Sequence, residues 1–289
     1  MKRFVIEAKN ILLFFSLLVF VACGNQARSS VIVSRISSSS SEPSEDDEIE
    51  EQSAVLEDAG NLDGADMPIY KGKDKLSQTI KKRYSYIVSY NHETKEPNWV
   101  SWVLTAAHAS GKEPRHDFMD DEDMPAPKGY LSDYYNSGFD RGHMCPAGDN
   151  KWSEKAMEDC FLITNMCPQD NNLNRGVWNS IEQQCRTWAK KYGKVYIVCG
   201  PIFLNKQHRK LGKNKVYVPE AFFKVVLCAG KTPKAIGFIC RNTTQKGKKK
   251  TDFVNTVDEV ERITGYDFFS QLPDQVENRI EAEADIAEW

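Results

Sequence analysis

A long polar segment, residues 24–66, restricts where this chain can fold. It contains the serine run 37–41, and residues 42–66 hold eleven acidic side chains and no lysine or arginine. Such a composition offers too little apolar surface to offset the entropy lost on ordering, so we expect a disordered tether. The sequence therefore predicts one folded domain, residues 67–289.

Residues 1–23 have the pattern of a secretory signal. Basic residues precede the apolar run 11–22, which is shorter than the roughly 20 residues of a membrane-spanning helix. The run ends directly before Cys23 and resembles a bacterial lipobox, although Phe20 stands where leucine is usual. We expect cleavage before Cys23, lipidation of its thiol and anchoring of an exported protein in a bacterial cell envelope, facing the periplasm or the surface. A membrane-spanning anchor helix is the alternative interpretation.

The net charge of −3 hides an uneven distribution. Residues 1–41 carry +4 and residues 42–66 carry −11, so residues 67–289 carry +4. Because the last sixteen residues are acidic, residues 67–273 reach +9. A basic body behind an acidic tether suits a polyanionic substrate.

Eight cysteines in an exported chain predict an oxidising environment and disulfide bonds that stabilise the domain. With Cys23 lipidated, seven remain, so at least one thiol is expected to be free. Cys228 and Cys240 lie on neighbouring strands of a predicted hairpin and are the first candidates for a bridge. The sequence contains no CxxC pair, which argues against a zinc site of that type.

The spacing of apolar residues within 67–289 predicts an α+β domain. Alternation predicts a strand at 84–90 paired with 99–105, and Ser153 is expected to cap a short helix. A helical repeat of apolar residues runs from 171 to 192, where Gly193 ends it. Further strands are predicted at 161–164, 195–199, 222–228 and 235–240, the last two as a hairpin.

Three polar residues of the predicted helix 171–192 fall on one stripe. Asn174 and Glu182 are eight residues apart, about 80° around the helix axis, and Arg186 follows one turn later. An amide oxygen, a carboxylate and a guanidinium together suit a hydrated hard cation beside a phosphate. A solvated helix face with an ion pair is the competing interpretation.

His143 adds the chemistry that the helix lacks. It follows Gly142, whose missing side chain lets the backbone approach other groups closely. A neutral histidine can take a proton from water when an acceptor holds its other ring nitrogen. Phosphodiester hydrolysis needs such a base, countercharge for the phosphate and help for the leaving oxygen, and Mg²⁺ and arginines can supply the last two.

The segment Asp140-Arg141-Gly142-His143 resembles the DRGH signature of the DNA/RNA non-specific endonucleases, the family of secreted bacterial nucleases and mitochondrial endonuclease G. The downstream blocks 164–169 and 173–182 are similar to the family's second block, in the same order and spacing. The resemblance extends from about residue 84 to the C-terminus. It implies a ββα-metal (His-Me finger) core on a mixed, mainly antiparallel sheet with flanking helices.

The resemblance also implies how the site works. His143 is the expected general base, and Asn174 is the only direct protein ligand of Mg²⁺, with Mn²⁺ as an alternative metal. Glu182 is expected to hold one of the metal's waters. The implied activity is sugar-nonspecific endonuclease cleavage of DNA and RNA. Because recognition would be through phosphates, binding should depend strongly on salt.

The remaining matched residues are expected to assist the reaction. Arg115 and Arg186 correspond to arginines that stabilise the transition state and the leaving group. Asn165 is expected to orient the site, and Asp140 and Arg141 to support the finger.

Two other functions compete with the endonuclease. The stretch 104–108, Leu-Thr-Ala-Ala-His, resembles the histidine signature of trypsin-like proteases. No serine in a GDSGG context accompanies it, so we expect His108 to be structural. A non-catalytic nucleic-acid-binding lipoprotein would keep the basic surface and lose part of the metal stripe. Here His143, Asn174 and Glu182 are all present, which favours the enzyme.

Overall fold

A seven-stranded sheet forms the centre of the described chain. The computed structural model describes residues 67–289, so the predicted signal, Cys23 and the tether lie outside the described residues. Every pair of neighbouring strands in the sheet is antiparallel. The order is β12 (Val254–Asn255), β11 (Lys234–Arg241), β10 (Ala221–Cys228), β7 (Lys194–Ile202), β4 (Glu96–Thr105), β3 (Ile87–Asn91) and β2 (Thr79–Lys82).

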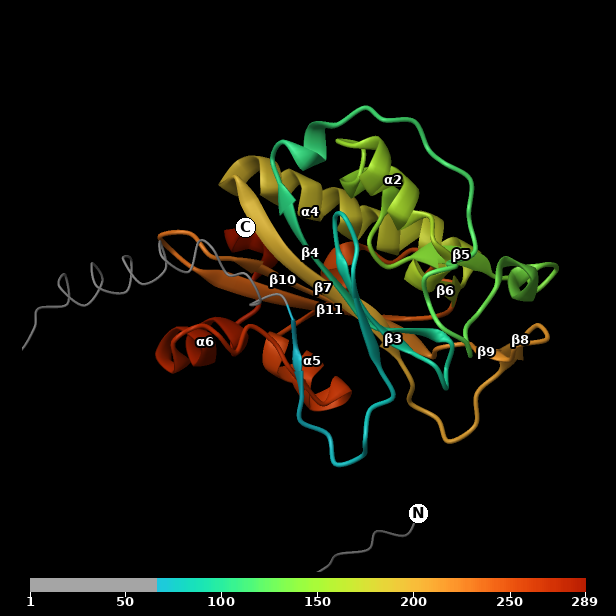
Figure 1. The fold of residues 1–289 in the computed structure, drawn as a ribbon. Coiled ribbons are helices and arrows are strands. Elements are labelled where there is room, and N and C mark those ends of the chain that lie inside the picture. The colour runs from blue at the N-terminus through green and yellow to red at the C-terminus, as the bar shows by residue number, and fades with distance from the viewer. Residues whose placement is uncertain (1–66) are drawn as a thin grey trace, which may run out of the picture. The chain divides into compact units, whose positions relative to one another are not determined.

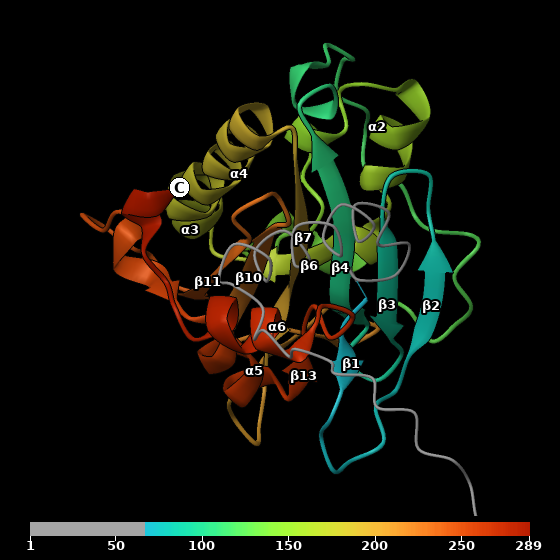
Figure 2. The same ribbon diagram turned by 90° about the vertical axis from the view of Figure 1, so that its left-hand side faces the viewer.

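Helices cover both faces of this sheet (Figures 1 and 2). α2 (Glu154–Cys160) and α4 (Asn179–Tyr192) lie on one face, and α5 (Val257–Thr264) and α6 (Asp274–Glu281) lie on the other. Within residues 67–289, no helix has the length and apolar character that crossing a membrane requires. The small strands are β1 (Ile69–Tyr70), β13 (Tyr266–Asp267), β8 (Lys210–Leu211) and β9 (Val216–Tyr217). The 3₁₀ turns are η2 (His108–Ser110), η3 (Leu131–Tyr134), η4 (Ala147–Asp149), η5 (Ile163–Asn165), η7 (Lys250–Phe253) and η8 (Ile286–Glu288).

β10 is apolar except for Lys224, and its position in the sheet explains why. Successive side chains of a strand point to opposite faces, and here both faces are covered. Phe222 and Val226 pack in the core beneath α4, whereas Phe223 and Val225 pack in the core beneath α5 and α6. All eight residues of the strand are therefore buried.

A separate two-stranded sheet carries the DRGH segment. β5 (Asp140–His143) pairs antiparallel with β6 (Met166–Gln169). Gly142 is needed here because a Cβ on it would lie 2.6 Å from the Cβ of Gln169. The chain then turns from β6 into the long helical segment. This ββα arrangement and the antiparallel sheet confirm the predicted fold class.

The predicted helix 171–192 is present but interrupted. α3 (Asn171–Leu173) is followed by the π-helical segment η6 (Asn174–Trp178) and then by α4. Gly176 inside η6 has non-helical dihedral angles, φ −101° and ψ −108°. Short π segments often occur at functional sites. The uniform 100° spacing assumed for Asn174 and Glu182 is therefore wrong.

Most other predicted elements are confirmed. The strands at 84–90 and 99–105 correspond to β3 and β4, which pair, and Ser153 caps α2 by accepting a hydrogen bond from the backbone of Ala156. The buried strand 195–199 and the hairpin 222–240 correspond to β7 and to β10 with β11. The strand predicted at 161–164 is wrong, because this segment forms a turn and part of η5.

The predicted disulfide bonds are wrong. All seven cysteines of the described chain are free and buried. Cys228 lies opposite Lys234, and Cys240 lies opposite Phe222, so the two cysteines stand at opposite ends of their hairpin. Six residues of a strand span about 20 Å, far beyond the reach of a disulfide. Buried free cysteines act here as small apolar side chains.

Candidate active site

A cleft of about 880 Å³ opens beside β5 and the start of α4. Four arginines and two acids lie in its walls, so the cleft attracts anions. Seven of the eight residues that the sequence assigned to catalysis, metal binding or support line it: Arg115, Asp140, Arg141, His143, Asn174, Glu182 and Arg186. The helix stripe is therefore part of a cleft and not an ordinary solvated face.

His143 lies at the end of β5 between aromatic rings. The imidazole is 4.8 Å from the ring of Phe161 and 5.5 Å from that of Phe118, centroid to centroid. Burial, together with the positive charges of Arg115 and Arg141, lowers the pKa of His143 to about 3. The ring is therefore neutral at pH 7, the form that a base requires.

The two ring nitrogens of His143 differ. Nε2 is buried and has no hydrogen-bond partner within residues 67–289. His143 lines the cleft and Nδ1 is not among the buried, unpartnered atoms of the described chain, so we infer that Nδ1 faces the cleft. An acceptor was expected at the second nitrogen of His143; in the described chain the Phe118 and Phe161 rings hold the imidazole instead.

Asn174 is oriented by Asp140 across the hairpin and helix. Its Nδ2 donates a hydrogen bond of 3.0 Å to Asp140, which leaves the amide oxygen as the group available in the cleft. Asp140 also accepts hydrogen bonds from Asn171 and from Arg175. Burial opposes ionisation of Asp140, but these hydrogen bonds prevail and lower its pKa. Asp140 therefore stays charged and holds Asn174 in one orientation.

Glu182 lies one turn into α4 in a partly buried position. Burial raises its pKa to about 7, and the positive charge of Lys224 opposes that shift. Lys224 is 1% exposed, and its ammonium lies 4.8 Å from the Trp102 ring and 4.7 Å from the Trp178 ring. A buried cation thus sits beneath the carboxylate that faces the cleft.

Arg186 is held by Asp149. Arg186 Nη1 donates a hydrogen bond of 2.7 Å to Asp149 Oδ1, while Trp102 Nε1 donates one of 3.0 Å to the other oxygen. Burial raises the pKa of Asp149, and Arg186 opposes that change. A buried ion pair with extra hydrogen bonds fixes the guanidinium more firmly than an exposed one.

Arg115 and Arg141 approach His143 from the aromatic side. The guanidinium of Arg141 lies 4.2 Å from the Phe118 ring, and that of Arg115 lies 5.3 Å from the Phe161 ring. Cation–π contacts of this kind position arginine without neutralising it. Both charges remain available to a phosphate in the cleft.

Asn165 is the assigned residue that does not line the cleft. It is fully buried, and its side chain accepts a hydrogen bond from the Cys145 backbone and donates to the carbonyls of Cys145 and Cys160. These bonds fasten the turn after His143 to the end of α2. Asn165 thus lies behind the site, where it can orient β5.

Several residues of the site were not found by sequence reasoning. Asp149 and Lys224 act through burial and charge. No local sequence pattern predicts that a charged residue in a loop or a strand will be buried. Phe118 and Phe161 hold the imidazole, but an isolated phenylalanine reads as ordinary core. His108, the protease-like residue, stacks on Trp152 at 4.2 Å and is absent from the cleft lining, as a structural role predicts.

Comparison with known proteins identifies the family. The family model described as DNA/RNA non-specific endonuclease matches residues 63–275. The chain belongs to this family. It is therefore an enzyme that hydrolyses nucleic acids. The family membership predicted from the DRGH segment is confirmed.

Individual relatives agree with that assignment. A mitochondrial nuclease of Saccharomyces cerevisiae is 34% identical, with 67% of this chain and 66% of the relative covered. Human mitochondrial endonuclease G is 32% identical, with coverage of 67% and 70%. A nuclease of Nostoc sp. is 32% identical, with coverage of 69% and 76%.

The fold is similar to a solved structure as well. A chain in the crystal structure of the EndoG/EndoGI complex, described as showing the mechanism of EndoG inhibition, superposes with a TM-score of 0.64 at 26% identity. The superposition covers 81% of this chain and 95% of that chain.

Proposed function

We propose that this enzyme is a Mg²⁺-dependent endonuclease that cleaves DNA and RNA with little regard to sequence, with His143 as general base. One observation carries the proposal: a single electropositive cleft holds a neutral histidine, an oriented asparagine amide and three arginines assigned to catalysis or support. These are the groups that phosphodiester hydrolysis requires.

The donor chemistry fits a hydrated hard cation. With its amide nitrogen bonded to Asp140, Asn174 offers an oxygen, and Glu182 offers carboxylate oxygens to metal-bound water. Mg²⁺ binds oxygen and keeps several waters, so one direct protein ligand suffices, and Mn²⁺ is an alternative. When bound, the metal supplies positive charge to the phosphate oxygens in the transition state.

His143 and the arginines perform the rest of the reaction. Nδ1 of His143 accepts a proton from a water in the cleft, and that water attacks phosphorus. Arg115 and Arg186 offset the negative charge that grows on the phosphoryl oxygens and the leaving oxygen. Because phosphate binding neutralises Arg115 and Arg141, we expect the pKa of His143 to rise in the substrate complex, which strengthens the base. By analogy with the family, the products should carry 5′-phosphates.

Recognition through the backbone explains the breadth of substrate. The charged groups of the cleft are arginines that suit phosphate, a feature common to DNA and RNA. Cleavage should therefore weaken steeply as salt rises. A single preferred site among sequenced fragment ends would contradict this part of the proposal.

For localisation, we infer export and lipid anchoring through Cys23, on the sequence pattern of residues 1–23 alone. Replacement of Cys23 by serine should release the protein from the membrane fraction or block its processing. Unchanged membrane partition, with no lipid detected by mass spectrometry, would disprove the anchor.

The decisive experiment uses the full-length protein purified in mild detergent. Plasmid DNA and RNA are incubated with and without Mg²⁺ or EDTA, and cleavage is followed over time. His143→Ala should lower the rate at least about 10²-fold, the usual scale of a general base, while the half-saturating Mg²⁺ concentration stays unchanged. Asn174→Ala should instead raise that concentration, and Glu182→Ala should show a milder form of the same defect.

His108→Ala is the matched control, because this histidine lies outside the cleft and should leave the rate near that of the wild type. A wild-type cleavage rate for His143→Ala would disprove the proposed role of His143 as general base. Full cleavage in EDTA would disprove the proposed requirement for a metal ion.

A further inference from the structure

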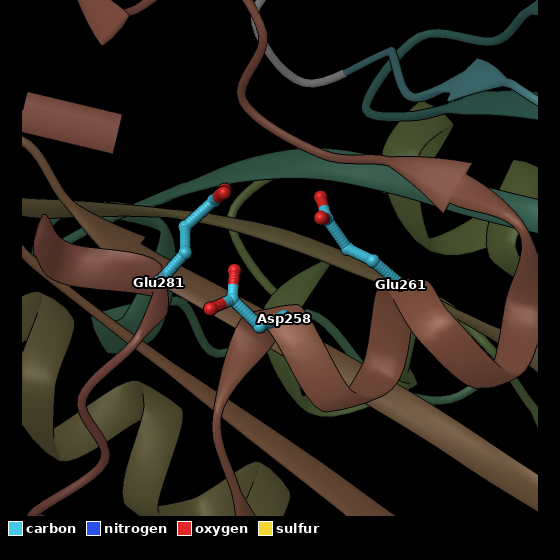
Figure 3. Close-up of side chains that lie close together, drawn as sticks. All are labelled: Asp258, Glu261 and Glu281. Carbon is cyan, nitrogen blue, oxygen red and sulfur yellow. The ribbon is translucent and has the colours of Figure 1, made fainter. Parts of the chain in front are cut away.

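Three carboxyl groups converge on the face of the sheet opposite the cleft. Asp258 and Glu261 lie on α5, and Glu281 is the last residue of α6 (Figure 3). One ligand oxygen from each lies within 4.8 Å of the other two. Like charges at such separations repel strongly, so the arrangement needs a physical explanation.

Glu281 is the member of the cluster whose charge is hardest to stabilise. The residue is only 4% exposed, and Oε1 is buried without a hydrogen-bond partner within residues 67–289. Figure 3 shows its carboxyl group turned toward those of Asp258 and Glu261. An unpaired buried carboxylate is costly, and native proteins rarely leave one without a proton or a cation.

The neighbouring charges make the cluster more acidic. Asp267 and Glu277 face it from β13 and α6. Lys71 pairs with Asp267, and Arg262 pairs with Glu259. Among the ion pairs of residues 67–289, none gives Asp258, Glu261 or Glu281 a basic partner.

The pKa values of two carboxyl groups in the cluster are raised. Burial, followed by the charge of Glu261, raises the pKa of Glu281 to about 9. Burial also raises the pKa of Glu261 to about 7, although the Phe268 backbone N–H donates a hydrogen bond of 2.7 Å to its Oε1. The protein alone does not stabilise three negative charges at this place.

We propose that Asp258, Glu261 and Glu281 bind a divalent cation, Ca²⁺ in particular, at a structural site separate from the active-site cleft. Only oxygen ligands are present, which disfavours zinc. Ca²⁺ takes six to eight oxygens in adaptable geometry, and three carboxylates plus waters at the exposed Asp258 can supply them. Mg²⁺ prefers fewer carboxylates and a regular octahedron, so it fits less well.

The position indicates what the cation does. It would connect α5 to the end of α6, and these helices form the layer that covers one face of the sheet. Binding to the folded form alone raises stability by mass action. The site therefore predicts a cation-dependent thermal stability that is independent of cleavage.

The test is thermal unfolding of the full-length protein at pH 8, first in EDTA and then with excess CaCl₂. At about 100 times its dissociation constant, Ca²⁺ should raise Tm by on the order of 5 °C or more. To exclude binding in the cleft, the measurement is made in an Asn174→Ala background, where the increase should persist.

Glu281→Gln should abolish the Ca²⁺-dependent increase without lowering Tm in EDTA, because at pH 8 the carboxyl, with its pKa raised to about 9, is mostly protonated and the amide keeps its shape. Asp258→Asn, at an exposed position, should weaken the increase and guards against a folding defect in the first variant. Glu259→Gln, on the same helix outside the cluster, should leave the increase intact. No increase in the wild type, or an equal increase in Glu281→Gln and Asp258→Asn, would overturn the proposal.

Discussion

Asn174 Nδ2 donates a hydrogen bond of 3.0 Å to Asp140 Oδ2, which ties the first residue of the π segment to the first residue of β5. The bond decides which end of the Asn174 amide is available in the cleft. It also explains why an aspartate is useful at the start of the DRGH segment: this carboxylate orients the amide proposed to bind the metal. Residues behind a metal ligand commonly affect metal affinity about 10- to 100-fold.

Asp140→Ala should therefore raise the Mg²⁺ concentration needed for half-maximal cleavage by about 10- to 100-fold. The amide of Asn174 loses its acceptor and can rotate. Metal titrations of the cleavage rate measure the effect. Arg175→Ala is the control, because this side chain is 74% exposed and also donates to Asp140, its Nε to the same Oδ2, but its removal leaves the Asn174 hydrogen bond in place. An unchanged metal requirement in Asp140→Ala would argue against the orienting role.

Arg186 and Asp149 should behave as one unit. Asp149→Asn removes the charge that holds the guanidinium, and Arg186→Lys removes the donor that reaches Asp149. Each should lower kcat by about 10- to 100-fold, the usual effect of misplacing a catalytic group. The double variant should be no slower than the worse single variant, because coupled residues are not additive. Strictly multiplicative losses in the double-mutant cycle would show that the two act separately.

Most residues predicted for the site line one cleft, and they could be named from the sequence because the family signature is local. The DRGH segment is four adjacent residues, and Asn174, Glu182 and Arg186 lie on one helical segment whose apolar repeat is strong. The π interruption at Gly176 was not predicted, since it leaves the apolar repeat almost unchanged. Asn174 and Glu182 nevertheless both line the cleft, although the helix between them is not ideal.

What the sequence could not predict depends on register and burial. The strands holding Cys228 and Cys240 were found, but their pairing follows from the five-residue connection 229–233, which places Cys228 opposite Lys234. Likewise, Asp149 and Lys224 become important only because tertiary packing buries them against Trp102. Such contacts join segments far apart in the chain, and no local periodicity encodes them.

Gly142→Ala should disturb the finger. An added Cβ would lie 2.2 Å from Gln169 Oε1 and 2.6 Å from Gln169 Cβ, so the two strands must separate. We expect a loss of stability of about 1 to 3 kcal/mol from overpacking. Because His143 is the next residue, its displacement should also cost roughly 10²-fold in rate. Gly230→Ala is the control, since nothing lies within 4 Å of its added Cβ. Wild-type Tm and rate in Gly142→Ala would contradict this account.

The pH dependence of cleavage should come from Glu182 and not from His143. Burial raises the pKa of Glu182 to about 7, so this group is charged at pH 8 and largely protonated at pH 6. His143, whose pKa is lowered to about 3, is neutral across that interval. At low Mg²⁺ the rate should therefore fall as pH decreases from 8 to 6. Raising Mg²⁺ should move the fall to lower pH, because the cation competes with the proton.

Two variants separate these assignments. Lys224→Met removes a positive charge that opposes the rise in the pKa of Glu182, so the midpoint should move upward from about 7. Glu182→Gln should be slower at every pH and lack the fall between pH 8 and 6. If Glu182→Gln instead retains the full pH dependence, another group titrates in this range. His143 would then be the group to test. Its pKa in the substrate complex would have to lie near 7, and phosphate bound between Arg115 and Arg141 would have to cause that rise.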